Sequence, residues 1–304
     1  KNRFVFLQER KGQVIMRIDG RTRVCGLMGY PVEHTLSPLI HNMLAEDLGH
    51  HLLYVPFSVE PDRVGEAVKG ARALNLMGLN VTVPHKSAVI PWLMEVDELA
   101  EKIGAVNTLV RCGDGYKGYN TDMTGLQSAM RTDGIELSGE SVVVLGAGGA
   151  ARAVAFLCAH AGAREVWLLN RTPERAVQIA REVNDAFGRD CVHGLALAAH
   201  EKIPKGQYLA VQGTSVGLYP HTEEVVIREE GFYEKIHTGY DLIYRPGDTR
   251  FMQLVRAHGG KAYNGLKMLA YQAVHAYELW NGVKVDEAET NRIIQILREE
   301  TNVI

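Results

Sequence analysis

Short apolar runs alternate with amphipathic stretches along this chain. The runs at 24–28, 52–57 and 142–145 have the length and composition of buried strands. Between them, residues 64–74 repeat apolar side chains every three or four positions, which is typical of a helix with one buried face. That face carries Val64, Ala67, Val68, Ala71 and Leu74. The alternation predicts an α/β fold.

The rest of the chain continues this pattern. We expect further strands at 4–7, 14–18, 81–83, 105–110, 116–119, 166–169, 208–212 and 239–244. We expect further helices at 37–48, 125–131, 266–280 and 286–300, and one that begins at 152. Ser37 followed by Pro38 suits a helix start, because serine is a good N-cap and proline a good first helical residue.

A glycine-rich turn follows the apolar run 142–145 and precedes a helical pattern. The segment GAGGAA at 146–151 matches G-x-G-x-x-G/A, with Ala151 in the last place. Gly146 permits a tight turn, Gly148 lets the backbone approach a pyrophosphate, and Ala151 lets helix and strand pack closely. The N-terminus of the helix offers unpaired N–H groups to phosphates. We predict a dinucleotide site here, the alternative being a tight turn that binds no nucleotide.

The end of the next strand discriminates between the two nicotinamide cofactors. An NAD site usually places Asp or Glu there, to bond the ribose 2′-hydroxyl. This chain has NRTPER at 170–175 instead, with Arg171 and Arg175 where a 2′-phosphate would lie. Arginine binds phosphate through two hydrogen bonds, whereas an acid would repel it. The segment therefore favours NADP over NAD, the alternative being that Thr172 and Pro173 start a helix and both arginines are surface residues.

Composition narrows the class of protein. The 304 residues suffice for two domains, and 46% are apolar. The net charge of −3 gives no reason to expect nucleic acid or an acidic membrane as a partner, and no apolar run reaches bilayer length. The four cysteines are scattered without paired spacing, so we expect reduced thiols in a cytoplasmic protein, without a disulfide framework. The histidines form no ligand cluster, and we predict no metal.

Three polar positions near predicted strand ends are candidates for chemistry. Thr35 is a hydroxyl residue in a turn after the strand at 24–28, where ligands of open sheets bind. Lys86 follows the strand at 81–83 and suits a catalytic cation, although most lysines are solvated surface charges. Asp122 precedes a helix, for which it would otherwise serve as N-cap.

Seven separated motifs occur in one order: HTLSPLIHN, NVTVPHK, GAVNT, YNTD, GAGGAAR, NRTPER and, more weakly, GLKMLAYQA. Together they resemble the shikimate/quinate dehydrogenase family, from about residue 24 to residue 282. The resemblance implies an α/β substrate domain at 1–121 plus 265–304, and a Rossmann-like NADP-binding domain at 122–264. The active site would lie in the cleft between these two domains.

The resemblance also implies residue roles. Thr35 and Ser37 would bind the substrate carboxylate, helped by Tyr244, and the ring hydroxyls would meet Thr82, Asn107, Asp122 and Gln272. Lys86 and Asp122 would form the catalytic pair. When the ketone of 3-dehydroshikimate is reduced to shikimate, negative charge grows on its oxygen, and a lysine ammonium can stabilise that charge and deliver the proton.

The cofactor would contact small and polar residues at the ends of several strands. We expect these contacts at Gly146, Ala147, Gly148, Gly149, Ala150, Asn170, Arg171, Thr172, Arg175, Thr214, Ser215, Val216, Leu242 and Gly265.

Three positions depart from the pattern usual in the family. Thr35 replaces a serine, Gln212 replaces an asparagine, and Lys267 replaces a glycine, which would put a cation near the rim of the cleft. They leave open a quinate/shikimate enzyme with relaxed substrate or cofactor choice. A non-catalytic nucleotide- or metabolite-sensing protein is a remoter alternative, because Lys86 and Asp122 are both present. The paired hydroxyls of HTLSP argue against a methylenetetrahydrofolate dehydrogenase. A homodimer is an open alternative that the sequence does not decide.

Overall fold

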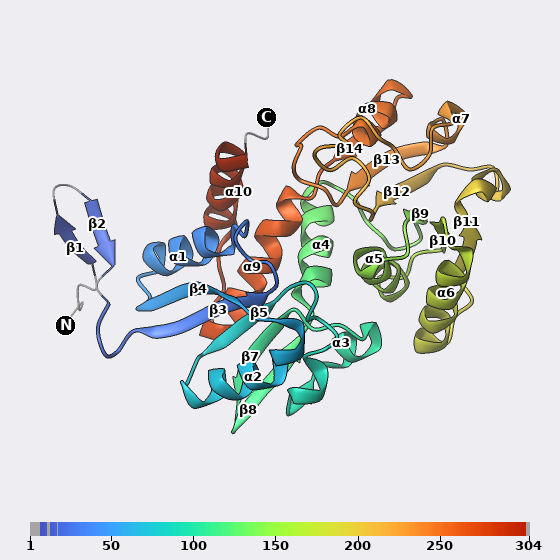
Figure 1. The fold of residues 1–304 in the computed structure, drawn as a ribbon. Helices are drawn as coiled ribbons and strands as arrows, with labels where there is room; N and C mark the ends of the chain where they lie inside the picture. The colour runs from blue at the N-terminus through green and yellow to red at the C-terminus, as the bar shows by residue number, and fades with distance from the viewer. Residues whose placement is uncertain (1–6, 11–12, 17, 302–304) are drawn as a thin grey trace. The chain divides into compact units, whose positions relative to one another are not determined.

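The computed structural model describes residues 7–10, 13–16 and 18–301 of the chain. The chain divides into two compact units (Figure 1). Unit 1 combines Lys1–Thr121 with Ala273–Asp286, and unit 2 combines Asp122–Gln272 with Glu287–Ile304. Each contains one six-stranded sheet, which confirms the α/β class. No helix in the described ranges is long and apolar enough to cross a lipid bilayer.

Unit 1 contains a mixed sheet with the strand order β4-β3-β5-β7-β8-β6. Strands β3, β4 and β5 are parallel, while β7 is antiparallel to both β5 and β8. The strands are β3 (Arg23–Gly29), β4 (Leu52–Ser58), β5 (Gly78–Val81), β6 (Glu95–Val96), β7 (Thr108–Cys112) and β8 (Gly115–Tyr119). A separate antiparallel pair, β1 (Leu7–Arg10) and β2 (Gln13–Met16), precedes them.

Unit 2 contains a parallel sheet with the strand order β11-β10-β9-β12-β13-β14. The order reverses direction between β9 and β12, and in open α/β sheets ligands bind beside the carboxyl ends of the strands at such a point. The strands are β9 (Ser141–Leu145), β10 (Glu165–Asn170), β11 (Val192–Ala196), β12 (Tyr208–Gln212), β13 (Ile236–Asp241) and β14 (Lys261–Tyr263).

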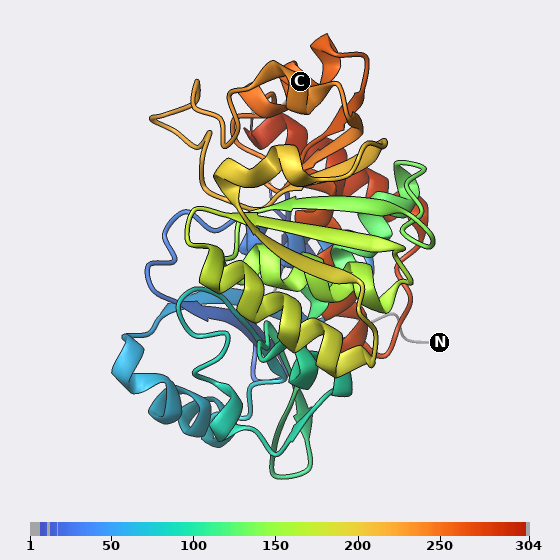
Figure 2. The same ribbon diagram turned by 90° about the vertical axis from the view of Figure 1, so that its right-hand side faces the viewer.

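Helices cover both sheets, and α6 runs along β10 and β11 (Figure 2). The early helices are α1 (Ser37–Asp47), α2 (Val64–Ala73), α3 (Glu98–Ile103) and α4 (Thr121–Thr132). The later ones are α5 (Gly149–His160), α6 (Pro173–Phe187), α7 (Glu230–Tyr233), α8 (Arg250–Ala257), α9 (Leu266–Asn281) and α10 (Glu287–Thr301). In unit 1, Gly78 leaves room for the Trp280 indole, whose Nε1 donates to the Leu109 carbonyl at 2.9 Å. This contact attaches the end of α9 to the sheet.

Most predicted elements are confirmed, but several ends differ. Helix α5 starts inside the glycine turn, because Gly148 is its N-cap. Strand β5 stops at Val81 and leaves Val83 exposed, since Pro84 has no N–H to extend the ladder. Strand β13 ends at Asp241, short of the predicted end at 244. Leu74 is 76% exposed, because α2 ends one residue before it. Of the strand predicted at 4–7, residues 4–6 lie outside the described residues.

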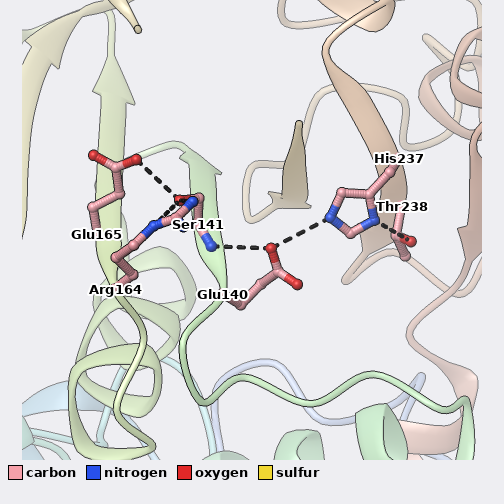
Figure 3. A network of polar contacts seen from close by, with 6 residues as sticks. All are labelled: Glu140, Ser141, Arg164, Glu165, His237 and Thr238. Atoms are coloured by element: carbon pink, nitrogen blue, oxygen red, sulfur yellow. Dashed lines mark hydrogen bonds and ion pairs between the residues drawn. The ribbon is translucent and has the colours of Figure 1, made fainter. Parts of the chain in front are cut away.

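A polar network joins the amino ends of three strands in unit 2 (Figure 3). The Glu140 carboxylate pairs with His237 at 3.4 Å and also accepts the backbone N–H of Ser141 at 3.0 Å. The Ser141 hydroxyl in turn donates to Glu165. The glycine turn follows the carboxyl end of β9. This network therefore holds the amino ends of the strands, on the side of the sheet opposite the predicted cofactor site.

A buried carboxylate joins the carboxyl ends of β12 and β13. The Asp241 side chain is fully buried and accepts hydrogen bonds from the Thr249 hydroxyl at 2.6 Å, the Ile243 N–H at 3.0 Å and the Gln212 amide at 3.4 Å. Burial raises the pKa of Asp241 to about 6, although these three donors oppose the shift. Since Thr249 is also the N-cap of α8, one carboxylate organises two loops and a helix start.

The raised pKa of Asp241 predicts a specific pH dependence of stability. Between the unfolded pKa of about 4 and the folded pKa of about 6, the folded chain holds a proton that the unfolded chain releases. The free energy of unfolding therefore falls as the pH rises through this window, by on the order of 3 kcal/mol. Asp241→Asn should remove this decrease. Urea unfolding of both proteins from pH 4 to 7 measures it, and parallel curves would contradict the assignment.

Candidate active site

The glycine turn after β9 presents open backbone to solvent. Gly146 has a φ of +112°, and a Cβ there would lie 2.8 Å from Cγ2 of Thr214, so only glycine fits. A Cβ on Gly148 or Gly149 would meet no atom within 4 Å. The fold itself therefore does not need these two glycines, whereas a pyrophosphate approaching the start of α5 would. The first turn of α5 carries no acidic residue, and Ala147 and Ala150 flank the open backbone.

The loop after β12 packs against this turn. A Cβ on Gly213 would lie 3.1 Å from Cα of the fully buried Ala151, so small residues let the two segments meet. The Gln212 side chain makes two hydrogen bonds to the backbone of this loop. Its Oε1 accepts the Thr214 N–H at 2.6 Å, and its Nε2 donates to the Val216 carbonyl at 3.0 Å. The loop thus holds Thr214 and Val216 in place and leaves Ser215 exposed.

The residues predicted to bind a 2′-phosphate follow the end of β10. Asn170 donates to the Thr172 carbonyl at 2.9 Å, and α6 starts at Pro173. The Thr172 side chain makes no capping hydrogen bond. Arg171 and Arg175 are exposed, and neither guanidinium pairs with a carboxylate in the part of the chain that the structure describes. Both are therefore available to an anion.

Beyond β13, two predicted cofactor contacts approach each other closely. A Cβ on Gly265 would lie 2.2 Å from the Leu242 carbonyl oxygen, and the Gly265 N–H donates to Ile243 at 3.1 Å. Glycine is therefore required where α9 begins. Tyr244, which follows the strand rather than ending it, is partly buried, and burial raises the pKa of its hydroxyl.

Thr35 and Ser37 lie together at the start of α1 in unit 1. The Ser37 N–H donates to Oγ1 of Thr35 at 3.2 Å, and Ser37 is the first residue of the helix. The prediction that Ser37 is the N-cap is therefore wrong, because Leu36 takes that position and the Thr35 hydroxyl satisfies a helix N–H. Ser37 is 9% exposed and Thr35 somewhat more, so two hydroxyl groups mark this helix start.

The loop that carries Lys86 follows β5 and is held on several sides. The Val106 N–H donates to the Lys86 carbonyl at 2.8 Å, and the fully buried His85 ring contacts the Val59 carbonyl at 2.7 Å. At the start of the loop, the Thr82 N–H donates to the Met28 carbonyl at 2.9 Å. The backbone at Lys86 is thus fixed relative to neighbouring parts of unit 1, and its side chain is half-buried.

The Asn107 side chain holds the start of α4. Its Oδ1 accepts the Thr121 N–H at 2.6 Å, and its Nδ2 donates to the Thr121 hydroxyl at 3.0 Å. Thr108 bonds to Asn107 and Thr121, and Asn80 donates to Thr108 at 3.0 Å. The sequence analysis selected Asn107 but not Asn80, Thr108 or Thr121. A polar residue inside the apolar segment GLNV was the available signal for Asn80.

Asp122 and Gln272 belong to unit 2, on two helices that touch. A Cβ on Gly125 would lie 2.6 Å from the Gln272 backbone nitrogen, so α4 and α9 meet at this glycine. Asp122 lies one turn before Gly125, on the same face of α4, and in the first turn, where the helix dipole favours an acid. The Gln272 amide donates to the Leu269 carbonyl at 2.9 Å.

Lys267 is engaged within unit 2. Its ammonium pairs with Asp133, a carboxylate that is 7% exposed, directly after α4. Burial raises the pKa of Asp133, and the hydrogen bond to Lys267 opposes the shift. Lys267 therefore joins the start of α9 to the end of α4.

Three ranges of the chain match family models of shikimate dehydrogenase domains. Residues 27–109 match the shikimate dehydrogenase substrate binding domain, 128–193 match shikimate/quinate 5-dehydrogenase, and 265–295 match the shikimate 5′-dehydrogenase C-terminal domain. The NADP(+) shikimate dehydrogenase of Caldanaerobacter subterraneus subsp. tengcongensis is 42% identical over 272 residues, which is 90% of this chain and 96% of that relative.

Two solved structures are similar throughout. Thermus thermophilus shikimate 5-dehydrogenase in complex with NADP(H) and shikimate aligns with a TM-score of 0.78 and 35% identity, covering 90% of this chain and 99% of the other. Corynebacterium glutamicum quinate dehydrogenase in complex with NAD aligns with a TM-score of 0.83 and 28% identity, covering 91% and 99%. The motifs, the fold and these matches agree, and the chain belongs to the shikimate dehydrogenase family.

Proposed function

We propose that the protein catalyses the reversible, NADP-dependent reduction of 3-dehydroshikimate to shikimate, a step of aromatic amino acid biosynthesis. The observation that carries this proposal is the hydrogen bond from the Val106 N–H to the Lys86 carbonyl. This bond fixes the backbone of Lys86, a cationic residue, beside Val106. The next residue is Asn107, whose side-chain amide suits a ring hydroxyl. The curated relative named above supports the substrate and the cofactor.

Lys86 and Asp122 supply the acid–base chemistry in this proposal. The Lys86 ammonium stabilises the growing negative charge on the ketone oxygen and then delivers a proton to it. In the oxidation of shikimate, neutral Lys86 accepts the proton of the alcohol. The Asp122 carboxylate accepts a hydrogen bond from the neighbouring hydroxyl of the substrate.

The other predicted residues bind and orient the substrate and the cofactor. Thr35 and Ser37 donate hydroxyl hydrogen bonds to the substrate carboxylate with help from Tyr244, while Thr82, Asn107 and Gln272 meet the ring hydroxyls. NADPH, when bound, supplies the hydride. Its pyrophosphate fits the open backbone at Gly148 and Gly149, and the exposed guanidinium groups beside α6 suit its 2′-phosphate.

A quinate/shikimate enzyme with relaxed cofactor choice is the second candidate. The observation that favours it is Thr35, whose methyl group alters the space beside the substrate carboxylate while its hydroxyl also accepts the Ser37 N–H. A cytoplasmic location agrees with three buried free thiols, at Cys25, Cys158 and Cys191. A homodimer stays a prediction.

Replacing Lys86 tests the acid–base assignment. Lys86→Ala should lower kcat for shikimate oxidation by about 10²- to 10⁴-fold, because the proton acceptor is lost. The Kd for NADP should stay within about twofold, since a residue of the chemical step adds little to cofactor affinity. Steady-state rates and a fluorescence titration with NADP measure the two quantities.

Lys102→Ala is the matched control for this test. Lys102 is a partly exposed lysine of the same unit that pairs with Glu98 on α3 at 2.8 Å. Its replacement should leave both kcat and the NADP Kd unchanged. Equal losses of turnover and NADP affinity in Lys86→Ala would instead assign the residue to the fold of the site.

Replacing Arg171 tests the cofactor assignment. Arg171→Ala should weaken NADP binding by about 10- to 100-fold, the range expected for losing a charged hydrogen bond to phosphate. NAD binding should not change. Arg181→Ala, which removes an exposed arginine within α6, serves as the control. A titration in which Arg171→Ala binds NADP as tightly as the unmodified protein would refute the role of this arginine.

A further inference from the structure

A continuous chain of hydrogen bonds crosses the sheet of unit 1. The Tyr54 hydroxyl on β4 donates to Oδ1 of Asn80 on β5 at 2.7 Å. Asn80 donates through Nδ2 to the Thr108 hydroxyl on β7 at 3.0 Å, and Thr108 donates to Oδ1 of Asn107 at 3.1 Å. This series of hydrogen bonds ends at Thr121, the first residue of α4. It therefore runs from the strand that follows α1 to the residue before Asp122.

The backbone of Thr121 fixes the direction of this chain. An N–H can only donate, so the atom of Asn107 that accepts the Thr121 N–H is its oxygen. The Asn107 nitrogen then faces the Thr121 hydroxyl. Thr108 consequently uses its proton on Asn107 and its lone pair on Asn80. Each side chain constrains the orientation of the next one.

The side chains of this hydrogen-bonded series are buried away from water. Tyr54 is 1% exposed, Asn80 4%, Thr108 0% and Thr121 2%. In such an environment hydrogen bonds strengthen one another, and a polar group that loses its partner is costly. The neighbouring His41 ring stacks on Tyr54 at 4.2 Å, and burial lowers its pKa to about 3, so it adds no positive charge at neutral pH.

The other end of this series of hydrogen bonds, at Tyr54, faces Ser37 at the start of α1. Burial raises the pKa of Tyr54 well above its usual range, and a hydrogen bond to Ser37 opposes this shift. The chain thus connects Ser37, proposed to bind the substrate carboxylate, with Asn107, proposed to bind a ring hydroxyl.

We propose that Thr108 and Asn80 are positioning residues, which set the orientation of the Asn107 amide and the start of α4. This inference rests on the proposed function for its effect on shikimate, but not for its effect on α4. Thr108 is the central joint, because its hydroxyl bonds to Asn80, Asn107 and Thr121. Neither residue touches the substrate in this proposal; both act through Asn107 and Thr121.

Thr108→Val tests the joint with almost no change of volume. The KM for shikimate should rise about tenfold, as expected for one misplaced hydrogen-bonding group, while the Kd for NADP stays within about twofold. Hydrogen–deuterium exchange should accelerate by at least about tenfold at residues 121–125, because the Asn107 amide no longer holds the Thr121 N–H. Exchange in β12 should not change.

Thr238→Val is the matched control. Thr238 is a buried strand threonine of unit 2 whose hydroxyl bonds to the His237 ring at 2.9 Å, in the network of Figure 3. Its replacement should leave the shikimate KM and the exchange at 121–125 unchanged. Asn80→Asp, a second variant, keeps an acceptor for Tyr54, loses the donor to Thr108, and should reproduce both effects of Thr108→Val.

The outcomes separate this inference from the proposed function. If Thr108→Val and Asn80→Asp lower only the melting temperature, with the KM and the exchange at 121–125 unchanged, both residues are merely structural and the inference is overturned. If the unmodified protein does not oxidise shikimate, the proposed function fails. The exchange at the start of α4 then still decides whether Thr108 positions it.

Discussion

The hydrogen bond between the Thr121 N–H and the Asn107 amide, 2.6 Å long, is the contact on which the proposed site most depends. The first N–H groups of a helix have no partner inside the helix, and here a side chain from another segment satisfies one of them. The same amide is proposed to bind a ring hydroxyl of the substrate. One side chain therefore fixes both a binding group and the helix start that precedes Asp122, and the buried residues behind it limit its freedom to turn.

In unit 2, the corresponding constraint is that backbone must stay open to a ligand at the carboxyl ends of the strands. Gly148 and Gly149 face free space, whereas a Cβ on Gly146 or Gly265 would collide with neighbouring atoms and one on Gly213 would be crowded by Ala151. Buried polar groups keep these loops in place. Gln212 holds the loop after β12, and Asp241 joins it to the loop after β13. The arrangement surrounds the point where the strand order reverses, which is where a dinucleotide is expected to bind.

Local patterns predicted most strands, though not β6, β11 or β14, together with the glycine turn and several helices, because periodicity and turn residues act over short stretches. Contacts between distant segments were not predictable in this way. Helix α4 starts at Thr121 because Asn107 caps it from another segment, and the sequence indicated a start at 125. Lys267 pairs with Asp133, which lies far away in the sequence, and no local pattern indicated this partner. The roles of Lys86 and Asp122 came from the family resemblance, since position alone left both with ordinary alternatives.

The most direct test of the proposed function is oxidation of shikimate and of quinate by the purified protein, each with NADP and with NAD. Formation of the reduced nicotinamide is followed by its absorbance. The proposed function predicts efficient turnover of shikimate with NADP and little in the other three combinations. Efficient turnover of quinate or with NAD would contradict the assigned specificity while keeping the fold and Lys86. No turnover in any combination would contradict the enzymatic function itself and favour a protein that only binds nucleotides or metabolites.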